Sequence, residues 1–273
     1  MLGYAVMKIA TWNVNSVRAR MPNILTWLKT SSPDIVLFQE IKCETSAFPA
    51  FEFEALGYKS HALGQKSYNG VAILSRFPIE DTLEHLPENE NDPQSRYLEA
   101  TIQGLRVASL YLPNGNPVTL DPFQSPVQFS DKYLYKLVWM ERFQKHAAQL
   151  LNKEHPIIFG GDYNIIPEAI DVYDPKGWEL DALYYSNSRA AYRSLINLGF
   201  TEAFRTLYPH QKNSFTFWDY QAGAWPKDNG LRIDHFLLSP EAADRMITCT
   251  IDRTPRGEEK ASDHTPVLLE LQI

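Results

Sequence analysis

The stretch Pro156-Ile157-Ile158-Phe159-Gly160-Gly161-Asp162-Tyr163-Asn164 contains a short apolar run that ends in two glycines and a polar pair. Because Pro and Gly bound the run, it predicts a buried strand that arrives at a tight turn. If the extended backbone continues past the glycines, the side chains of Asp162 and Asn164 point to one face. A simple turn is the alternative, because Gly, Asp and Asn are also the usual turn formers.

Other predicted strands also end in polar side chains, and this favours a shared site over unrelated turns. Lys8 to Trp12 predicts a strand that ends at Asn13-Val14-Asn15, with the same polar spacing as Asp162 and Asn164. Asp34 to Phe38 predicts a buried strand that stops at Gln39-Glu40. The repeated spacing is a hint of two similar halves that meet at one site.

The remaining pattern predicts further strands and at least three helices. Gln103-Gly104 is a plausible hairpin turn between Tyr97–Ile102 and a second strand that delivers Tyr111. Helical spacing recurs from Pro22 to Lys29, from Leu137 to Leu150 and from Arg189 to Leu198. With few regular βαβ units, this indicates an α/β protein of two mostly antiparallel sheets packed face to face, with helices outside. A doubly wound parallel sheet is the alternative.

Composition narrows the class of protein. At 273 residues and 44% hydrophobic content, the chain can bury a large core, and we expect a single domain over residues 1–273. No membrane-length apolar run is present, and Met1 to Met7 does not resemble a signal peptide, so we expect a cytoplasmic protein, working as a monomer. Cys43 and Cys249 have no metal-binding spacing, which argues against zinc. The net charge of −7 means that any nucleic-acid site must be a local basic patch.

Seven motifs occur together in a recognisable order. They are Trp12-Asn13-Val14-Asn15, Gln39-Glu40-x-Lys42, Tyr111-x-Pro113-Asn114-Gly115, Gly161-Asp162-x-Asn164, Phe217-Trp218, Arg232-x-Asp234 and Ser262-Asp263-His264-x-Pro266. In order and spacing, from about Lys8 to Leu271, the chain resembles the exonuclease III family of abasic-site endonucleases. The resemblance implies the four-layer α/β sandwich of the deoxyribonuclease I superfamily, hydrolysis of DNA phosphodiesters and dependence on Mg²⁺, with Mn²⁺ as a substitute.

The resemblance also implies roles for individual residues. Glu40 would hold the metal, with Asn15 and Asp263 completing its shell. Asp162, fixed by Asn164 and Asn13, would orient or deprotonate the attacking water, while Asp234 would orient His264 toward the phosphate. Tyr111 would donate a hydrogen bond to the same phosphate. Each also has an ordinary structural explanation: His264 as half of a surface pair with Asp263, Tyr111 as a packing residue, and Asp234 as a local salt bridge to Arg232.

The partner implied by the resemblance is double-stranded DNA with abasic sites or blocked 3′ ends, and two groups of residues would contact it. Residues in loops beside the motif-bearing strand ends could track phosphates or flank the site, namely Arg18, Arg20, Lys42, Lys66, Tyr68, Arg96 and Asn114. Phe217, Trp218 and Leu231 resemble the family's apolar pocket for a sugar that has lost its base, although Phe217 and Trp218 could equally fill the core.

The sequence departs from the family pattern at three positions, and two other functions remain as alternatives. Ser16 stands where Gly is usual, Ile41 where Thr is usual, and Leu231 where the animal enzymes carry Trp. The runner-up function is a superfamily phosphoesterase that acts on an inositol phosphate or sphingomyelin. The third is a DNA-binding protein without activity, which would be expected to lack at least one of the catalytic side chains. The segment from Pro167 to Ser188 is irregular, so it is either functional or mobile.

Overall fold

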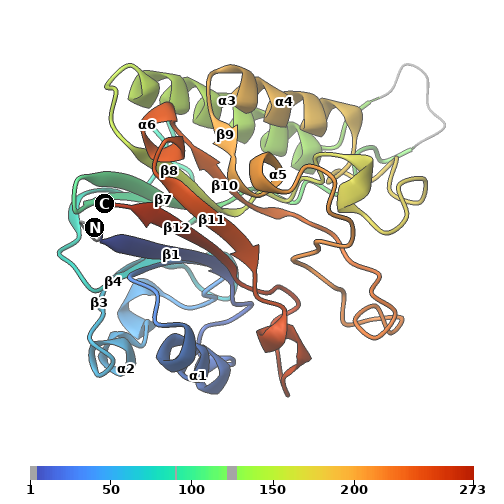
Figure 1. Ribbon diagram of the computed structural model, residues 1–273. Coiled ribbons are helices and arrows are strands. Elements are labelled where there is room, and N and C mark those ends of the chain that lie inside the picture. The colour runs from blue at the N-terminus through green and yellow to red at the C-terminus, as the bar shows by residue number, and fades with distance from the viewer. Residues whose placement is uncertain (1–4, 90, 122–127) are drawn as a thin grey trace.

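Two six-stranded sheets pack face to face in the computed structural model, which describes residues 5–89, 91–121 and 128–273 (Figure 1). The first sheet has the order β11 (Met246–Ile251), β12 (Val267–Gln272), β1 (Val6–Asn13), β2 (Ile35–Gln39), β4 (Val71–Ser75), β3 (Lys59–Leu63). The second has the order β5 (Glu80–Leu83), β6 (Tyr97–Ile102), β7 (Leu105–Tyr111), β8 (Ile157–Asp162), β10 (Asp234–Leu238), β9 (Thr201–Glu202). Part of the Met1 to Met7 segment lies outside the described residues.

Helices cover the outer faces of both sheets (Figure 1). The outer helices are α1 (Met21–Ser31) and α2 (Ala50–Glu54) on the first sheet and α3 (Asp131–Leu151) and α4 (Ser186–Asn197) on the second. The short helices α5 (Ala203–Leu207) and α6 (Pro240–Ala243) instead contribute to the apolar cluster between the sheets, and short 3₁₀ turns lie at Thr45–Ala47, Ala169–Asp171 and Thr254–Gly257. The helix α1 begins with Pro22 in its first turn, where a missing N–H costs nothing, and α3 begins at Ser130, whose hydroxyl accepts from the Tyr133 N–H. No helix among the described residues is both long and apolar enough to cross a membrane.

Three apolar clusters hold together the four layers of the sandwich, which are helices, first sheet, second sheet and helices. Alternate residues of each strand face opposite sides, so Ile9 and Leu37 enter the cluster between the sheets while Ala10 and Phe38 face α1 and α2. In the second sheet Val107 faces inward, and Ala108 packs under α3 and α4 with Phe143 and Leu195. This arrangement confirms the predicted sandwich and rules out the doubly wound parallel sheet. Cys43 and Cys249 are buried free thiols.

The sheets are mostly antiparallel, as predicted, and each contains one parallel pair in the described part of the chain. These pairs are β1 with β2 and β7 with β8, and α1 and α3 respectively make the crossover connections. Consequently β1 and β8 hold corresponding places, each between a parallel and an antiparallel partner. The predicted echo between Asn13-x-Asn15 and Asp162-x-Asn164 therefore has a structural counterpart.

The glycine pair at the end of β8 is required by close packing. A Cβ on Gly160 would come 2.5 Å from the Phe236 ring and 2.7 Å from Leu37 of the opposite sheet. A Cβ on Gly161 would come 2.0 Å from the Leu110 carbonyl oxygen of β7. Only glycine therefore lets β8 lie close to β7, to β10 and to the facing sheet, with Asp162 as its last residue.

Candidate active site

Strands from both sheets end at one place and deliver polar side chains there. In register, Asn13 of β1 lies beside Gln39 of β2, while Asp162 of β8 lies between Tyr111 of β7 and Asp234 of β10. Glu40 directly follows β2, and His264 precedes β12. The two sheets thus bring together residues that lie more than two hundred positions apart in the sequence.

Asn13 ties the two sheets together at the site. Its buried Nδ2 donates to Glu40 Oε1 at 2.9 Å and to Asp162 Oδ2 at 2.9 Å, which uses both amide hydrogens. Its Oδ1 accepts from the backbone N–H of Asn15 at 3.0 Å. Asn13 therefore fixes the two carboxylates relative to each other.

Glu40 is held as an anion. Its backbone is left-handed, with φ of 49°, and its Oε2 lies 2.8 Å from Lys42 Nζ. Burial raises the pKa of Glu40, but Lys42 and the hydrogen bond from Asn13 outweigh burial, so the pKa lies below its usual value. Glu40 therefore carries a negative charge at neutral pH.

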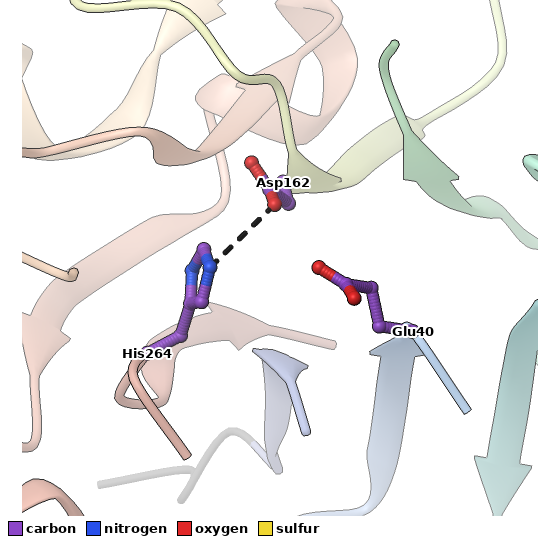
Figure 2. Close-up of side chains that lie close together, drawn as sticks. All are labelled: Glu40, Asp162 and His264. Atoms are coloured by element: carbon purple, nitrogen blue, oxygen red, sulfur yellow. Dashed lines mark ion pairs between the residues drawn. The ribbon is translucent and has the colours of Figure 1, made fainter. Parts of the chain in front are cut away.

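Asp234 and His264 form a buried hydrogen-bonded pair. His264 Nδ1 lies 2.9 Å from Asp234 Oδ2, which also accepts from the Thr216 hydroxyl at 2.6 Å. His264 Nε2 faces Asp162 Oδ2 at 3.7 Å, and Figure 2 shows this contact beside Glu40. Burial lowers the pKa of His264, but the two aspartates outweigh it and raise the pKa above its usual value. Asp234 Oδ1 is buried and finds no hydrogen-bond partner among the described residues.

Asp162 is a buried carboxylate between the other two. Burial raises its pKa above the usual range for an aspartate, His264 opposes this increase, and Asp234 adds to it. Its Oδ1 accepts from the backbone N–H of Asn164 at 2.9 Å. The strand passes the glycines but ends at Asp162, and Asn164 then has a left-handed φ of 47° and an Nδ2 that donates to the Leu112 carbonyl at 2.9 Å. The expectation of two side chains on one strand face was wrong, and Asn164 contacts Asp162 through its main chain.

A candidate metal-binding group lies at this point. The ligand atoms of Glu40, Asp162 and His264 are within 4.8 Å of one another. Two carboxylates fit a hard divalent cation such as Mg²⁺, which prefers oxygen ligands, whereas the His264 imidazole suits softer metals. The predicted partners Asn15 and Asp263 are bonded to each other, with Asn15 Nδ2 donating to Asp263 Oδ1 at 3.0 Å. Asn15 Oδ1 also accepts from Lys42, and a role for Asn15 and Asp263 as metal ligands stays a prediction.

Tyr111 lies at the end of β7 with the Arg96 guanidinium over its ring, 4.7 Å from the centroid. Burial, and then the charges of Glu40 and Asp162, raise the pKa of Tyr111 well above its usual value. Tyr111 is therefore a phenol at neutral pH and can donate a hydrogen bond. Arg96 also donates to the Tyr111 carbonyl at 3.2 Å, so it supports this residue.

Comparison with known proteins assigns this arrangement to a family. The model of the endonuclease/exonuclease/phosphatase family matches residues 10–264, a range that includes all the side chains described above. The chain belongs to this family. It is 31% identical over 280 residues to exodeoxyribonuclease III of Haemophilus influenzae, a match that covers 97% of this chain and 100% of that protein.

Solved structures give the same grouping. The AP endonuclease from Archaeoglobus fulgidus superposes with a TM-score of 0.90 at 35% identity, and the match covers 98% of this chain and 100% of that one. The 3′ phosphatase NExo from Neisseria, bound to a product DNA hairpin, superposes with a TM-score of 0.91 at 35% identity and the same coverage.

The predicted DNA-contacting residues of this family member fall into two sets. Arg18, Lys66 and Tyr68 are exposed, Asn114 is exposed but donates to Asn164 Oδ1 at 3.4 Å, and the other three contact protein groups. Arg20 donates to the Tyr220 hydroxyl at 2.9 Å, Lys42 pairs with Glu40, and Arg96 supports Tyr111. Some of the predicted DNA-contacting residues are therefore free to contact DNA, whereas Arg20, Lys42 and Arg96 hold other side chains or the main chain in place.

The predicted apolar pocket is only partly present. Phe217 and Leu231 pair through a β-bridge and share an apolar cluster with Trp178, and the Phe217 ring lies 4.9 Å from the His264 ring. Trp218 does not line this cluster, because it is 0% exposed and packs separately against Phe215 and Trp225. The pocket prediction was wrong for Trp218, which fills the core. Leu231 is itself only 1% exposed, so it supports Phe217 from beneath.

Three residues that the sequence reasoning missed complete the site. Thr216 holds Asp234, Tyr220 accepts from Asn15 Nδ2 at 3.2 Å, and Lys136 is fully buried behind Asn164. Thr216 directly precedes the Phe217-Trp218 motif, and this position was a usable signal. Lys136 directly precedes the predicted helical pattern of Leu137 to Leu150, and a lysine there is normally interpreted as a surface residue.

A local salt bridge between Arg232 and Asp234 is one expectation from the sequence, but Arg232 forms its ion pairs with other carboxylates. Its Nε lies 2.7 Å from Asp171 Oδ1 and its Nη1 lies 2.9 Å from Glu202 Oε1, and the guanidinium is buried. Removing one partner leaves buried carboxylates uncompensated, so Arg232→Met should lower the free energy of unfolding by about 3–5 kcal/mol. Urea denaturation measures this loss, with Arg193→Met on the exposed face of α4 as the control. An Arg232→Met variant as stable as the control would contradict the assignment.

Proposed function

We propose that this protein is a Mg²⁺-dependent DNA-repair phosphodiesterase that cleaves the strand 5′ to an abasic site in duplex DNA. The same site would also remove nucleotides from 3′ ends and clean blocked 3′ ends. The observation that carries the proposal is that Asn13 joins Glu40 to Asp162 while His264, held by Asp234, faces the same carboxylate. The similarity to an exodeoxyribonuclease III, an AP endonuclease and a 3′ phosphatase supports DNA as the substrate.

Asp162 is the group that orients or deprotonates the attacking water. A general base works best when its pKa lies near the working pH, and burial raises the pKa of Asp162 in that direction. Asn13 and the Asn164 main chain each occupy one oxygen of this carboxylate, which fixes its orientation. A water next to Asp162 would thus meet a base whose position is set before the substrate binds.

His264 and Tyr111 stabilise the charge that develops on the phosphate. Asp234 accepts from one ring nitrogen of His264, which leaves Nε2 facing the site as a donor when the ring is protonated. The raised pKa of Tyr111 keeps its hydroxyl proton available for a hydrogen bond to a phosphate oxygen. Donors in a buried site stabilise such charge more strongly than they would in water.

Glu40 is the residue that would hold Mg²⁺, with the Asp162 carboxylate beside it. The lowered pKa of Glu40 keeps it ionised, as a metal ligand must be. When bound, the cation supplies positive charge to the phosphate oxygens. Asn15 and Asp263 would complete the shell of the cation, and the hydrogen bonds of Asn15 to Asp263 and from Lys42 keep their oxygens beside Glu40.

DNA would approach over the exposed cations around the site. Arg18 and Lys66 are exposed beside it, and Tyr68 is 71% exposed, so a local patch can contact phosphates although the whole chain carries a net charge of −7. Phosphate contacts of this kind weaken steeply with salt.

Substrate choice should depend on the cluster beneath Phe217. Leu231→Ala removes the side chain that supports Phe217, so the pocket should accept an intact nucleotide more readily. A misfitted apolar group changes discrimination by about 1–3 kcal/mol, so we expect selectivity for the abasic substrate to fall roughly 10- to 200-fold. The measurement is the ratio of kcat/KM on matched duplexes with and without the lesion. An unchanged ratio would move selectivity to the Pro167 to Ser188 segment or to the bending of damaged DNA.

The chemistry of the products tests the proposed reaction. Incision 5′ to the lesion leaves a 3′ hydroxyl that a polymerase can extend, whereas cleavage on the other side leaves a blocked end. We expect a fragment that is extended without further treatment, and release of inorganic phosphate from a 3′-phosphorylated duplex. Hydrolysis of an inositol phosphate or sphingomyelin without either DNA reaction would favour the alternative phosphoesterase.

A further inference from the structure

Lys136 is a buried cation that contacts main-chain carbonyls alone. It lies in α3 at 0% exposure, and its Nζ donates to Asn164 O at 2.7 Å, Asn114 O at 3.1 Å and Ala182 O at 3.3 Å. No carboxylate pairs with it among the described residues. The three hydrogens of the ammonium are thus matched by three carbonyl oxygens.

Burial of a lysine ammonium without a carboxylate partner is energetically unfavourable. Burial lowers the pKa of Lys136 to about 7, although Asp181 and Asp162 oppose this effect. A methionine of similar length would fill the same space in the core without a buried charge. Stability alone therefore does not explain the ammonium, and its three acceptors indicate what it organises.

The three carbonyls belong to segments that form the site. Asn114 lies in the loop after β7, which carries Tyr111, and Ala182 lies in the segment that leads to α4. Asn164 lies in the left-handed turn after β8, and its N–H holds Asp162 Oδ1 at 2.9 Å. Lys136 thus holds the carbonyl side of the same residue whose N–H orients the proposed base.

Gly115 provides an independent sign that the position of Lys136 is enforced. A Cβ at Gly115 would come 2.7 Å from Lys136 Cδ and 3.3 Å from its Cβ. The backbone at Gly115 has φ of +87°, which glycine alone adopts readily. The Asn114-Gly115 motif therefore both supplies a carbonyl to the ammonium and leaves room for its stem.

We propose that Lys136 is a positioning residue for the proposed cleavage reaction: it fastens the loops after β7 and β8 so that Asp162 and Tyr111 keep their reacting geometry. This inference rests on the proposed function. Lys136 does not touch substrate, so its loss should affect turnover more than binding. A misplacement of about 1 Å at a reacting group can cost roughly 100-fold in rate.

The test compares three variants with the parent on an abasic-site duplex. Lys136→Met should lower kcat about 100-fold with KM within about threefold of the parent, at a temperature where circular dichroism shows a folded chain. Lys136→Gln keeps N–H donors and should recover part of the lost kcat. Lys145→Met, in the same helix at an exposed pair with Glu141, should change neither constant.

The outcomes distinguish a failure of the proposed function from a failure of the positioning role. A parent without activity on DNA would overturn the proposed function and this inference together. An active parent with normal kcat in a folded Lys136→Met variant, or with only KM changed, would overturn the positioning role alone. If Lys136→Met does not fold, Lys136→Gln decides at the same position: a kcat below that of the parent with an unchanged KM supports the role, and a kcat equal to that of the parent overturns it.

Discussion

Asp162→Asn should abolish nearly all turnover while DNA binding is kept or strengthened. The amide preserves the shape of the side chain, but it cannot take a proton, and its single oxygen can keep only one of the two hydrogen bonds that the carboxylate accepts from Asn13 Nδ2 and the Asn164 N–H. Loss of a general base typically costs about 10²- to 10⁴-fold in rate, and loss of a charge next to the metal-binding group adds to this. Removal of a negative charge also relieves repulsion of the phosphate, so affinity should not fall.

Single-turnover cleavage and fluorescence anisotropy measure the two quantities separately. Asp244→Asn is the matched control. Asp244 is exposed and directly follows α6, and α6 comes after the end of β10 that is opposite to Asp234. It should change neither rate nor affinity. Weakened binding with near-normal turnover in Asp162→Asn would contradict the role assigned to Asp162.

Glu40→Gln should show a large loss of activity that depends on metal concentration. The Gln carbonyl can still accept from Asn13 Nδ2, whereas the negative ligand and the ion pair with Lys42 are lost. At low Mg²⁺ most activity should disappear, and at high Mg²⁺ part of it should return. A Mg²⁺ titration of the cleavage rate gives the answer, and a titration curve that matches the parent's would mean that Glu40 is not a ligand.

The fold was largely predictable because it follows from local pattern. Apolar runs such as Ile157 to Phe159 and the turn at Gln103-Gly104 mark their elements by themselves, and Gln103 and Gly104 have φ of 51° and 75° as a tight hairpin turn requires. The polar residues at strand ends also pointed to one site. That Asn13 joins Glu40 to Asp162 could not be derived from pattern, because Asn13 and Asp162 lie 149 positions apart.

The errors share a cause, which is that tertiary packing decides what a side chain faces. Trp218 belongs to a motif suited to a pocket, yet it is enclosed by Phe215 and Trp225 and donates to Asp228 at 3.0 Å. Arg232 is two residues from Asp234 but finds Asp171, which lies 61 positions away. Lys136 lies among core-facing residues of α3. Periodicity alone cannot show that main-chain carbonyls accept hydrogen bonds from its ammonium.

Incision of a duplex with a single abasic site, with and without Mg²⁺, tests the central claim most directly. A labelled duplex with the lesion, a matched intact duplex and a sphingomyelin substrate are incubated with the parent and with Asp162→Asn. The account predicts one cut on the 5′ side of the lesion by the parent in Mg²⁺, none in excess EDTA and very little by the variant. Equal incision in EDTA, equal activity of the variant, or hydrolysis of the phospholipid in place of DNA would contradict it.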